Sequence, residues 1–299
     1  MSILVVGSVA LDTVKTPFGE ADEALGGAAV FFSIAASFFA PVNLVGVIGQ
    51  DFPERHLDLL RERDIDLSGL QRAPGKTFRW KGYYEYDLSE AHTLDTQLNV
   101  FSDFRPELPE AYRDCEFVFL ANIDPELQGV VLDQVRNPRL VVCDTMNFWI
   151  ENKRDELIKT IGRVDVMMLN EAEARELAGE PNLVMAARKI MAMGPKRVII
   201  KKGEHGVCAF HDCGYFILPG YPLEYVFDPT GAGDSFGGGF LGAVAAAGDV
   251  TEQSIRKAVV YGSVLASFNV EAFSCERLRG LNREEIEARY EDFLRFTSF

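Results

Sequence analysis

One short segment of the chain has the residue types and spacing that suit phosphate chemistry. Residues 228–234 read Asp-Pro-Thr-Gly-Ala-Gly-Asp, between an extended run at Leu223–Phe227 and a helical run at Phe236–Ala247. Glycines at such a corner let backbone N–H groups converge, and the new helix directs the positive end of its dipole there. Asp234 adds a carboxylate that can accept a proton from a hydroxyl group during phosphoryl transfer. A simple turn capped by Asp234 is the alternative interpretation.

Polar and small residues near the N-terminus suit an alcohol substrate. Asp12 lies just past the first predicted strand, whose carboxyl end faces the ligand crevice in a parallel sheet. There it can accept hydrogen bonds from substrate hydroxyls, although a solvated turn would need no ligand. Gly26 and Gly27 precede the predicted helix Ala28–Ala40 and allow either a close approach of substrate or an ordinary turn.

Two further segments have residue types that suit a nucleotide. Asn170 and Glu173 follow the predicted strand Val164–Leu169 and fall on one side of a new helix turn. They can order the water shell of Mg²⁺ bound to phosphates, and they also fit a helix capping box. Residues 201–206 read Lys-Lys-Gly-Glu-His-Gly, which suits either a phosphate contact or a solvated hairpin tip.

Two other segments resemble nucleotide-binding motifs but depart from them. The run Gly69–Thr77 has five residues between its glycines where a P-loop has four, and an aromatic strand follows instead of a helix. In residues 231–236, Phe236 stands where a dinucleotide fingerprint has its third glycine, too late in the chain for a Rossmann half. A nicotinamide-dependent oxidoreductase is therefore a poor fit.

Composition narrows the class of protein. The chain has 299 residues, 47% of them hydrophobic, which is ordinary for a globular protein. A net charge of −15 argues against nucleic acid or an anionic membrane as a partner. The five cysteines lack paired spacing, so neither a zinc site nor a disulfide framework is expected. Together with the lack of a leader or a long apolar span, these features predict a cytoplasmic protein.

Short apolar runs alternate with helical stretches along the chain. This alternation predicts an α/β fold with a mostly parallel sheet covered on both faces. The predicted strands are Ile3–Gly7, Val42–Ile48, Glu116–Leu120, Leu140–Asp144, Val164–Leu169 and Arg197–Lys201. The predicted helices are Ala28–Ala40, Glu54–Asp64, Pro125–Val135, Lys153–Gly162, Glu171–Ala178 and Asn182–Met193.

Two segments deviate from this rhythm. In Thr77–Asp87 aromatic and charged residues alternate, which predicts an antiparallel strand with Gln97–Phe101 as its partner. Such a hairpin would project and cover a substrate cleft, a second subunit or its own domain. The glycines at 237–239 weaken a helix interior, so another element or a ligand is expected close to them, unless the helix frays there.

In this order the segments resemble the ribokinase-like (PfkB) family of carbohydrate and nucleoside kinases. The resemblance implies a ribokinase-like three-layer fold, with a mostly parallel central sheet and a small β-sheet lid. It implies a single kinase domain over residues 1–299, with a lid formed by about 12–24 and 74–103. The matching segments are Gly26-Gly27, Val45 to Asp51, Asn170 with Glu173, Lys202-Gly203 with Gly206, and Asp228 to Asp234.

The resemblance also implies roles for individual residues. Asp234 would be the catalytic base, with the backbone of Gly231, Ala232 and Gly233 as the anion hole. Asp12, Gly26, Gly27 and Phe31 would line the substrate site. Asn170, Lys201, Gly203, Gly206 and Thr230 would contact ATP, and Asn170 and Glu173 would act on Mg²⁺ indirectly. Asp228 and Thr230 would lie near a monovalent cation such as K⁺.

Two positions depart from the family pattern. Many sugar kinases have an asparagine where this chain has Phe31, so one hydrogen bond to a polyol is missing. Ala272 stands where a glycine is common, which weakens the expectation of a cation site. The residues around Gly26 and Asp228 look more like those of adenosine and inositol kinases than those of ribokinase.

The sequence thus predicts an ATP- and Mg²⁺-dependent kinase that phosphorylates a hydroxyl of a small sugar, cyclitol or nucleoside. Alternatives are a kinase restricted to nucleosides, of the adenosine type, and a non-catalytic ligand-sensing protein on the same fold. A homodimer formed through the lid is a further prediction.

Overall fold

The computed structural model describes residues 1–298, which form two β-sheets and the helices around them. The larger sheet is parallel except at one edge, where the last two strands run antiparallel. This topology confirms the mostly parallel sheet. Its nine strands lie in the order β13 (Gly214–Leu218), β12 (Val207–His211), β11 (Arg197–Lys201), β10 (Val166–Asn170), β9 (Leu140–Cys143), β8 (Phe117–Leu120), β1 (Ile3–Val6), β4 (Val42–Ile48) and β5 (Ile65–Arg72).

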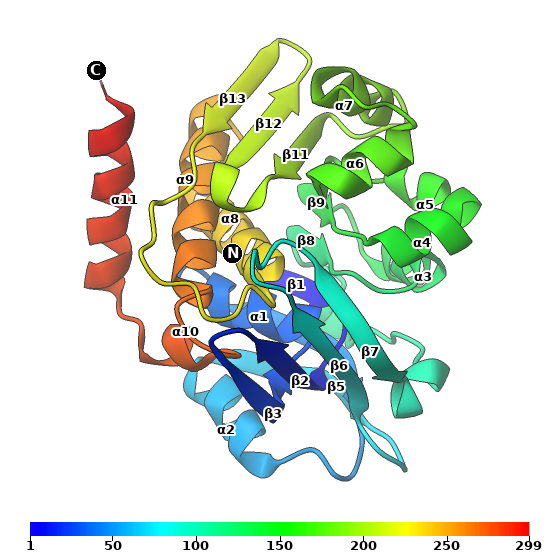
Figure 1. The fold of residues 1–299 in the computed structure, drawn as a ribbon. Coiled ribbons are helices and arrows are strands. Elements are labelled where there is room, and N and C mark those ends of the chain that lie inside the picture. The colour runs from blue at the N-terminus through cyan, green and yellow to red at the C-terminus, as the bar shows by residue number, and fades with distance from the viewer. Residues whose placement is uncertain (299) are drawn as a thin grey trace.

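Helices cover both faces of this sheet, so the molecule has three layers (Figure 1). They are α1 (Ala28–Ala36), α2 (Glu54–Glu62), α3 (Pro125–Gln134), α4 (Asn147–Asn152), α5 (Arg154–Ile161), α6 (Glu171–Ala178), α7 (Leu183–Met191), α8 (Ala232–Ala247), α9 (Glu252–Asn269), α10 (Glu276–Gly280) and α11 (Arg283–Thr297). In residues 1–298 no helix is both long and apolar enough to cross a membrane.

Two hydrophobic cores fill the space between the layers. Neighbouring residues of a strand point to opposite faces of the sheet. Ile3 and Val5 therefore pack into one core with α1, α8 and α9, whereas Leu4 and Val6 pack into the other with α3, α5, α6 and α7. Because both faces are buried, the strands from β11 to β4 are mostly apolar, and this made them recognisable in the sequence. The edge strand β5 contains Asp66, Ser68 and Arg72 and was not predicted.

The smaller sheet projects from the large one, and we call it the lid (Figure 1). Its four strands lie in the order β3 (Gly19–Gly26), β2 (Ala10–Thr16), β6 (Phe78–Tyr84) and β7 (Ala91–Gln97). The aromatic block forms β6, but its predicted partner Gln97–Phe101 was wrong, because β6 pairs with β7. Strand β7 is polar and largely exposed, so it lacks the alternation that marks a strand, and Asn99–Asp103 is a 3₁₀ helix.

The predicted helices are present, with ends that differ by a few residues. Helix α1 ends at Ala36 rather than Ala40, and α8 begins at Ala232 rather than Phe236. The run Leu223–Phe227 is not a strand, although the Phe227 amide donates a hydrogen bond to the Val270 carbonyl at 2.8 Å.

The glycines at 237–239 lie where neighbouring helices approach α8 most closely. A Cβ on Gly238 would lie 2.3 Å from the Phe32 carbonyl oxygen of α1. A Cβ on Gly239 would lie 2.7 Å from the Tyr261 carbonyl oxygen of α9. The predicted close approach is confirmed, and it places α8 between α1 and α9.

Candidate active site

The carboxyl ends of adjacent parallel strands bring polar side chains together. Asp144 directly follows β9, Asn170 ends β10 and Lys201 ends β11. Ligands of open α/β sheets bind at this edge. The first turn of α8 reaches the same place, because a Cβ on Gly233 would lie 2.9 Å from the Lys201 Nζ.

Gly231 forms the turn that starts α8. Its φ of +76° lies in the left-handed region, and a Cβ would lie 2.4 Å from the ring of Phe31. Phe31 is only 2% exposed, so its ring supports the turn from within the core. The structure thus places Phe31 against the anion loop instead of on an open surface.

The backbone amides after Gly231 face the site from the start of α8. First-turn amides of a helix have no acceptor within that helix, and the helix dipole makes this end positive. The Ala232 amide donates to the Pro229 carbonyl at 3.1 Å, which leaves Gly233 and Asp234 as the first-turn amides of the anion loop. The arrangement suits an anion such as phosphate.

Asp234 lies in a cluster of acidic side chains that also contains Lys201. Lys201 forms an ion pair with Asp144, with 2.7 Å between Nζ and Oδ2. Burial of Asp234 and repulsion from Asp144 raise the pKa of its carboxyl group to about 7, although Lys201 opposes the rise. A carboxylate with this pKa is well matched to accept a proton at neutral pH.

Asn170 and Glu173 form the capping box that the sequence allowed. The Glu173 amide donates to the Asn170 side chain at 2.8 Å, and the Asn170 amide donates to the Glu173 carboxylate at 2.7 Å. Burial and the nearby charge of Asp144 raise the pKa of Glu173 to about 7. The capping box does not exclude the predicted role in ordering water around Mg²⁺, because the cap holds Glu173 close to Lys201 and Asp234.

The predicted alcohol-binding residues Asp12, Gly26 and Gly27 lie on β2 and where β3 joins α1, and Asp12 is close enough to Asp234 to be repelled by it. Asp12 lies on β2, and a Cβ on Gly26 would lie 1.9 Å from the Asp12 Oδ2, so a side chain at position 26 would displace the Asp12 carboxylate. Gly27, with φ of +96°, lies between β3 and α1 and is the N-cap residue of the helix. Burial raises the pKa of Asp12 to about 7 against a hydrogen bond from Gly27, with Asp228 and Asp234 adding repulsion.

Asp228 and Thr230 connect the anion loop to the lid and to the end of α9. Asp228 is 1% exposed and accepts hydrogen bonds from the amides of Thr230 and Ser274, at 2.9 and 3.2 Å. Burial raises the pKa of Asp228. The Thr230 hydroxyl donates to the Tyr84 hydroxyl at 3.2 Å, so β6 of the lid touches the loop directly.

The two glycines after Lys201 differ in their surroundings. A Cβ on Gly203 would meet nothing within 4 Å. Gly206 has φ of +88°, and a Cβ there would lie 2.1 Å from the Leu218 carbonyl oxygen. Gly203 thus faces open space beside the strand that carries Lys201, whereas Gly206 is required by the packing of β13.

The side chains at this site fit Mg²⁺ only if water molecules or phosphates lie between them and the ion. In residues 1–298, no three His, Cys, Asp or Glu side chains gather closely enough to hold a metal ion. Mg²⁺ keeps several waters and commonly binds phosphates, so direct protein ligands are not required. The negative charges of Asp144, Glu173 and Asp234 around Lys201 favour a cation beside bound phosphates.

The sequence did not single out Asp144 or Tyr84. Asp144 had a usable signal, because it directly follows an apolar strand as Asn170 does. Tyr84 was recognised as part of an alternating strand, but its contact with Thr230 depends on how the lid folds over the loop.

Comparisons with known proteins show the family of the chain. The model of the pfkB family carbohydrate kinase matches residues 6–278. A cytidine kinase from Thermococcus kodakarensis is 34% identical over 246 residues, which cover 81% of this chain and 87% of that protein. The chain therefore belongs to the pfkB family, and it is a phosphotransferase that uses an alcohol group as acceptor.

Solved structures share the fold. A nucleoside kinase from Methanocaldococcus jannaschii has a TM-score of 0.78 at 21% identity and covers 97% of this chain and 98% of its own. A putative ribokinase II from E. coli, in complex with ATP and Mg²⁺, has a TM-score of 0.79 at 18% identity, with coverages of 97% and 99%. The three-layer fold with its lid is that of ribokinase-like kinases.

Proposed function

We propose that the chain is an ATP- and Mg²⁺-dependent nucleoside kinase whose acceptor is a pyrimidine nucleoside of the cytidine type. The observation that carries this proposal is the 34% identity to a cytidine kinase across most of both chains. Phe31 gives further support, because it replaces the asparagine with which many sugar kinases bind a polyol.

The acceptor would lie between Asp12 and Asp234. Asp12 accepts hydrogen bonds from acceptor hydroxyls, and Gly26 leaves room for its carboxylate. Asp234 takes the proton of the acceptor hydroxyl as its oxygen bonds to the γ-phosphorus of ATP, and ADP leaves as its bond to that phosphorus breaks. The backbone amides of Gly231, Gly233 and Asp234, with the dipole of α8, would stabilise negative charge on the transferring group. The Ala232 amide, which the sequence placed in the same anion hole, is instead used by the Pro229 carbonyl.

The phosphoryl donor would lie along the ends of β10 and β11. Lys201 and Thr230 contact phosphate, and the open space at Gly203 leaves room for the nucleotide beside the turn that Gly206 completes. Asn170 and Glu173 order water around the donor phosphates. Mg²⁺, when bound, supplies positive charge to those phosphates.

Three sequence predictions remain part of this proposal. Asp228 is the candidate residue for a monovalent cation such as K⁺.

Tyr86 and Leu94, which are 85% and 60% exposed on the lid, would contribute to a homodimer. A dimer mass by light scattering would support that assembly and a monomer mass would refute it. A cytoplasmic location also stays a prediction.

A panel of acceptors tests the proposed function. ADP release is measured with ATP, Mg²⁺ and each of cytidine, uridine, adenosine, ribose and myo-inositol, in KCl and in tetramethylammonium chloride. We expect the highest kcat/KM with cytidine and greater activity in KCl. A preference for ribose or inositol would refute the nucleoside assignment, and binding without turnover would favour a ligand sensor.

A further inference from the structure

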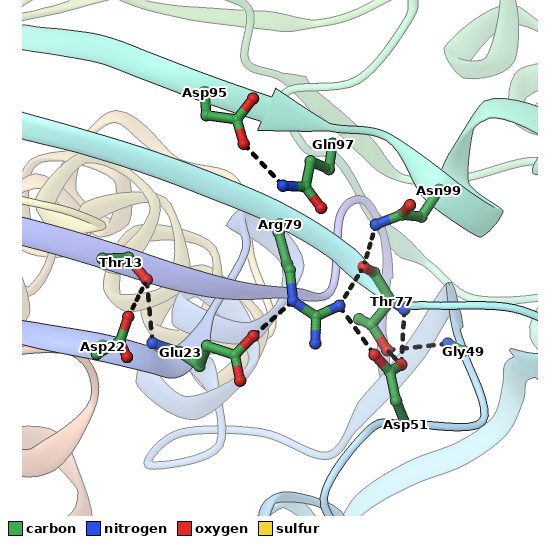
Figure 2. Close-up of polar contacts among 10 residues, drawn as sticks. All are labelled: Thr13, Asp22, Glu23, Gly49, Asp51, Thr77, Arg79, Asp95, Gln97 and Asn99. Atoms are coloured by element: carbon green, nitrogen blue, oxygen red, sulfur yellow. Dashed lines mark hydrogen bonds and ion pairs between the residues drawn. The ribbon is translucent and has the colours of Figure 1, made fainter.

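A cluster of polar residues lies where the lid joins the large sheet, and the proposed chemistry does not use it (Figure 2). Asp51 follows β4, whereas Thr77 and Arg79 lie at the start of β6. The Asp51 Oδ1 accepts hydrogen bonds from the Thr77 amide and hydroxyl, at 2.7 and 2.8 Å. The Asp51 Oδ2 lies 2.8 Å from the Arg79 Nη1. Glu23 of β3 accepts a hydrogen bond from the Arg79 Nε at 2.7 Å.

On the side of the large sheet, the cluster is fixed by backbone contacts. The Gly49 amide donates to the Thr77 hydroxyl at 3.0 Å, and the Gln50 amide donates to the Gly75 carbonyl at 2.9 Å. A Cβ on Gly49 would lie 2.5 Å from that same Gly75 oxygen. Asp51 and the start of β6 are thus held against the end of β4.

On the side of the lid, the cluster reaches the strand that carries Asp12. The pairing of β2 with β3 is irregular between Asp12 and Val14, and Glu23 has a φ of +44° there. The Thr13 hydroxyl stabilises this bulge by accepting a hydrogen bond from the Glu23 amide at 3.1 Å. Bulges redirect side chains, and here Glu23 extends across β2 to Arg79 (Figure 2).

Arg79 is well enclosed between the two carboxylates. Its side chain is 19% exposed, compared with 29% for Asp51 and 57% for Glu23. Burial alone would raise the pKa of Asp51, but hydrogen bonds from Thr77 and Arg79 outweigh it and lower that pKa. Asp51 is therefore charged at neutral pH, and its contact with Arg79 is a charge-assisted one.

We propose that Arg79 is a positioning residue for phosphoryl transfer. By contacting Asp51 and Glu23 together, it fixes the bulged part of the lid against the end of β4. That contact sets where Asp12 holds the acceptor relative to Asp234. The inference rests on the proposed function, because Asp12 matters in this way only if it binds the acceptor.

The test compares R79A, R79K and E23Q with R136A as a matched control. Arg136 also contacts two carboxylates, Asp114 and Glu110, but lies far from the lid in the sequence and outside the site. Each variant is assayed for the KM of acceptor and ATP, for ATP hydrolysis without acceptor, and for hydrogen exchange in β2 of the ligand-free protein.

We expect R79A to raise the KM for cytidine about tenfold, because loss of a charge-assisted contact loosens the acceptor site. The KM for ATP should change by less than about twofold, since Asn170 and Lys201 lie on β10 and β11 of the large sheet and not on the lid. Hydrogen exchange in β2 and acceptor-free hydrolysis should both increase. E23Q should give a smaller change, R79K should recover part of the loss, and R136A should match the wild type.

Two results would overturn the inference. One is an R79A variant with wild-type cytidine KM and wild-type exchange in β2. The other is faster exchange in the large sheet as well as the lid, which would indicate general destabilisation. If the wild type phosphorylates no acceptor, the proposed function fails, whereas the exchange measurement still decides whether Arg79 holds the lid.

Discussion

Asp12, Glu173 and Asp234 each have a carboxyl pKa raised to about 7, and burial is the main cause for all three. Asp234 repels both of the other acids, so protons bind to the group as coupled sites. Raised pKa values at a site suit proton transfer near neutral pH. In the ligand-free protein, the site therefore changes charge within the physiological range.

The raised pKa of Asp234 should make kcat/KM for the acceptor depend on pH on the acidic side of neutrality. Protonated Asp234 cannot accept the acceptor proton, so kcat/KM for the acceptor should fall as the pH drops below about 7. The decline should reach about tenfold per pH unit, or more where Asp12 is protonated as well. Initial rates at fixed ionic strength measure it, and a flat profile to about pH 5.5 would contradict it.

Acid unfolding should not explain that decline. The folded-state pKa of these acids is raised, so their stabilising contribution is complete below the unfolded value near 4 and is lost as the pH rises through about 7. These groups therefore make the ligand-free protein more stable at pH 6 than at pH 8. Thermal unfolding at both pH values provides the control.

At the residue scale, the sequence predicted the groups that belong to local motifs. Asp234 could be identified from the sequence, because the Gly-Ala-Gly-Asp run predicts an anion loop from a few adjacent residues. Asp144 was missed although it directly follows an apolar strand, because its role depends on an ion pair with Lys201, which ends a different strand. Phe31 was predicted as a substrate contact, but whether its ring faces ligand or supports Gly231 depends on helix packing.

At the scale of elements, helix α8 carries the anion loop and is fixed by close packing. The oxygen of Phe32 leaves no room for a side chain at Gly238. We expect Gly238→Ala to lower the free energy of unfolding by about 2–3 kcal/mol, because backbone atoms must move apart. Denaturant unfolding measures this change.

Gly129→Ala is the matched control. Gly129 lies within α3, where a Cβ would meet only the Thr160 hydroxyl at 3.9 Å. This variant should raise the free energy of unfolding by about 0.5–1 kcal/mol, through helix propensity. Equal effects of the two substitutions would contradict the packing argument.

Strands could be predicted where burial of one or both of their faces leaves a pattern of apolar residues in the sequence. The buried strands of the large sheet and the aromatic strand β6 met this condition. Strand β7 did not, because its side chains are mostly exposed and polar, and its pairing with β6 is set by the fold. The lid boundaries came from the family resemblance, since no local pattern distinguishes β3 from a polar loop.

At the scale of the whole molecule, the proposed donor ATP is an anion, whereas the chain has a net charge of −15. Lys201 and the helix dipole act locally, whereas the overall field repels nucleotide. Salt screens long-range repulsion more than contacts inside the site. The KM for ATP should therefore fall as salt rises from about 20 to about 200 mM, while the KM for an uncharged nucleoside stays constant.

Steady-state kinetics in tetramethylammonium chloride measures this effect without supplying K⁺. A rise in the KM for ATP with salt would mean that positive groups at the site dominate the field instead. A parallel change in the KM for the nucleoside would indicate an effect of salt on the protein itself.

The most direct test of the account is turnover by Asp234→Asn. Asparagine keeps the shape of the side chain but cannot accept the proton, so kcat should fall by about 10²–10⁴-fold, the range expected for a general base. ATP binding by calorimetry should stay close to that of the wild type, and the exposed substitution Asp133→Asn should change neither quantity. Near-normal turnover by Asp234→Asn would contradict the assignment of Asp234 as the base.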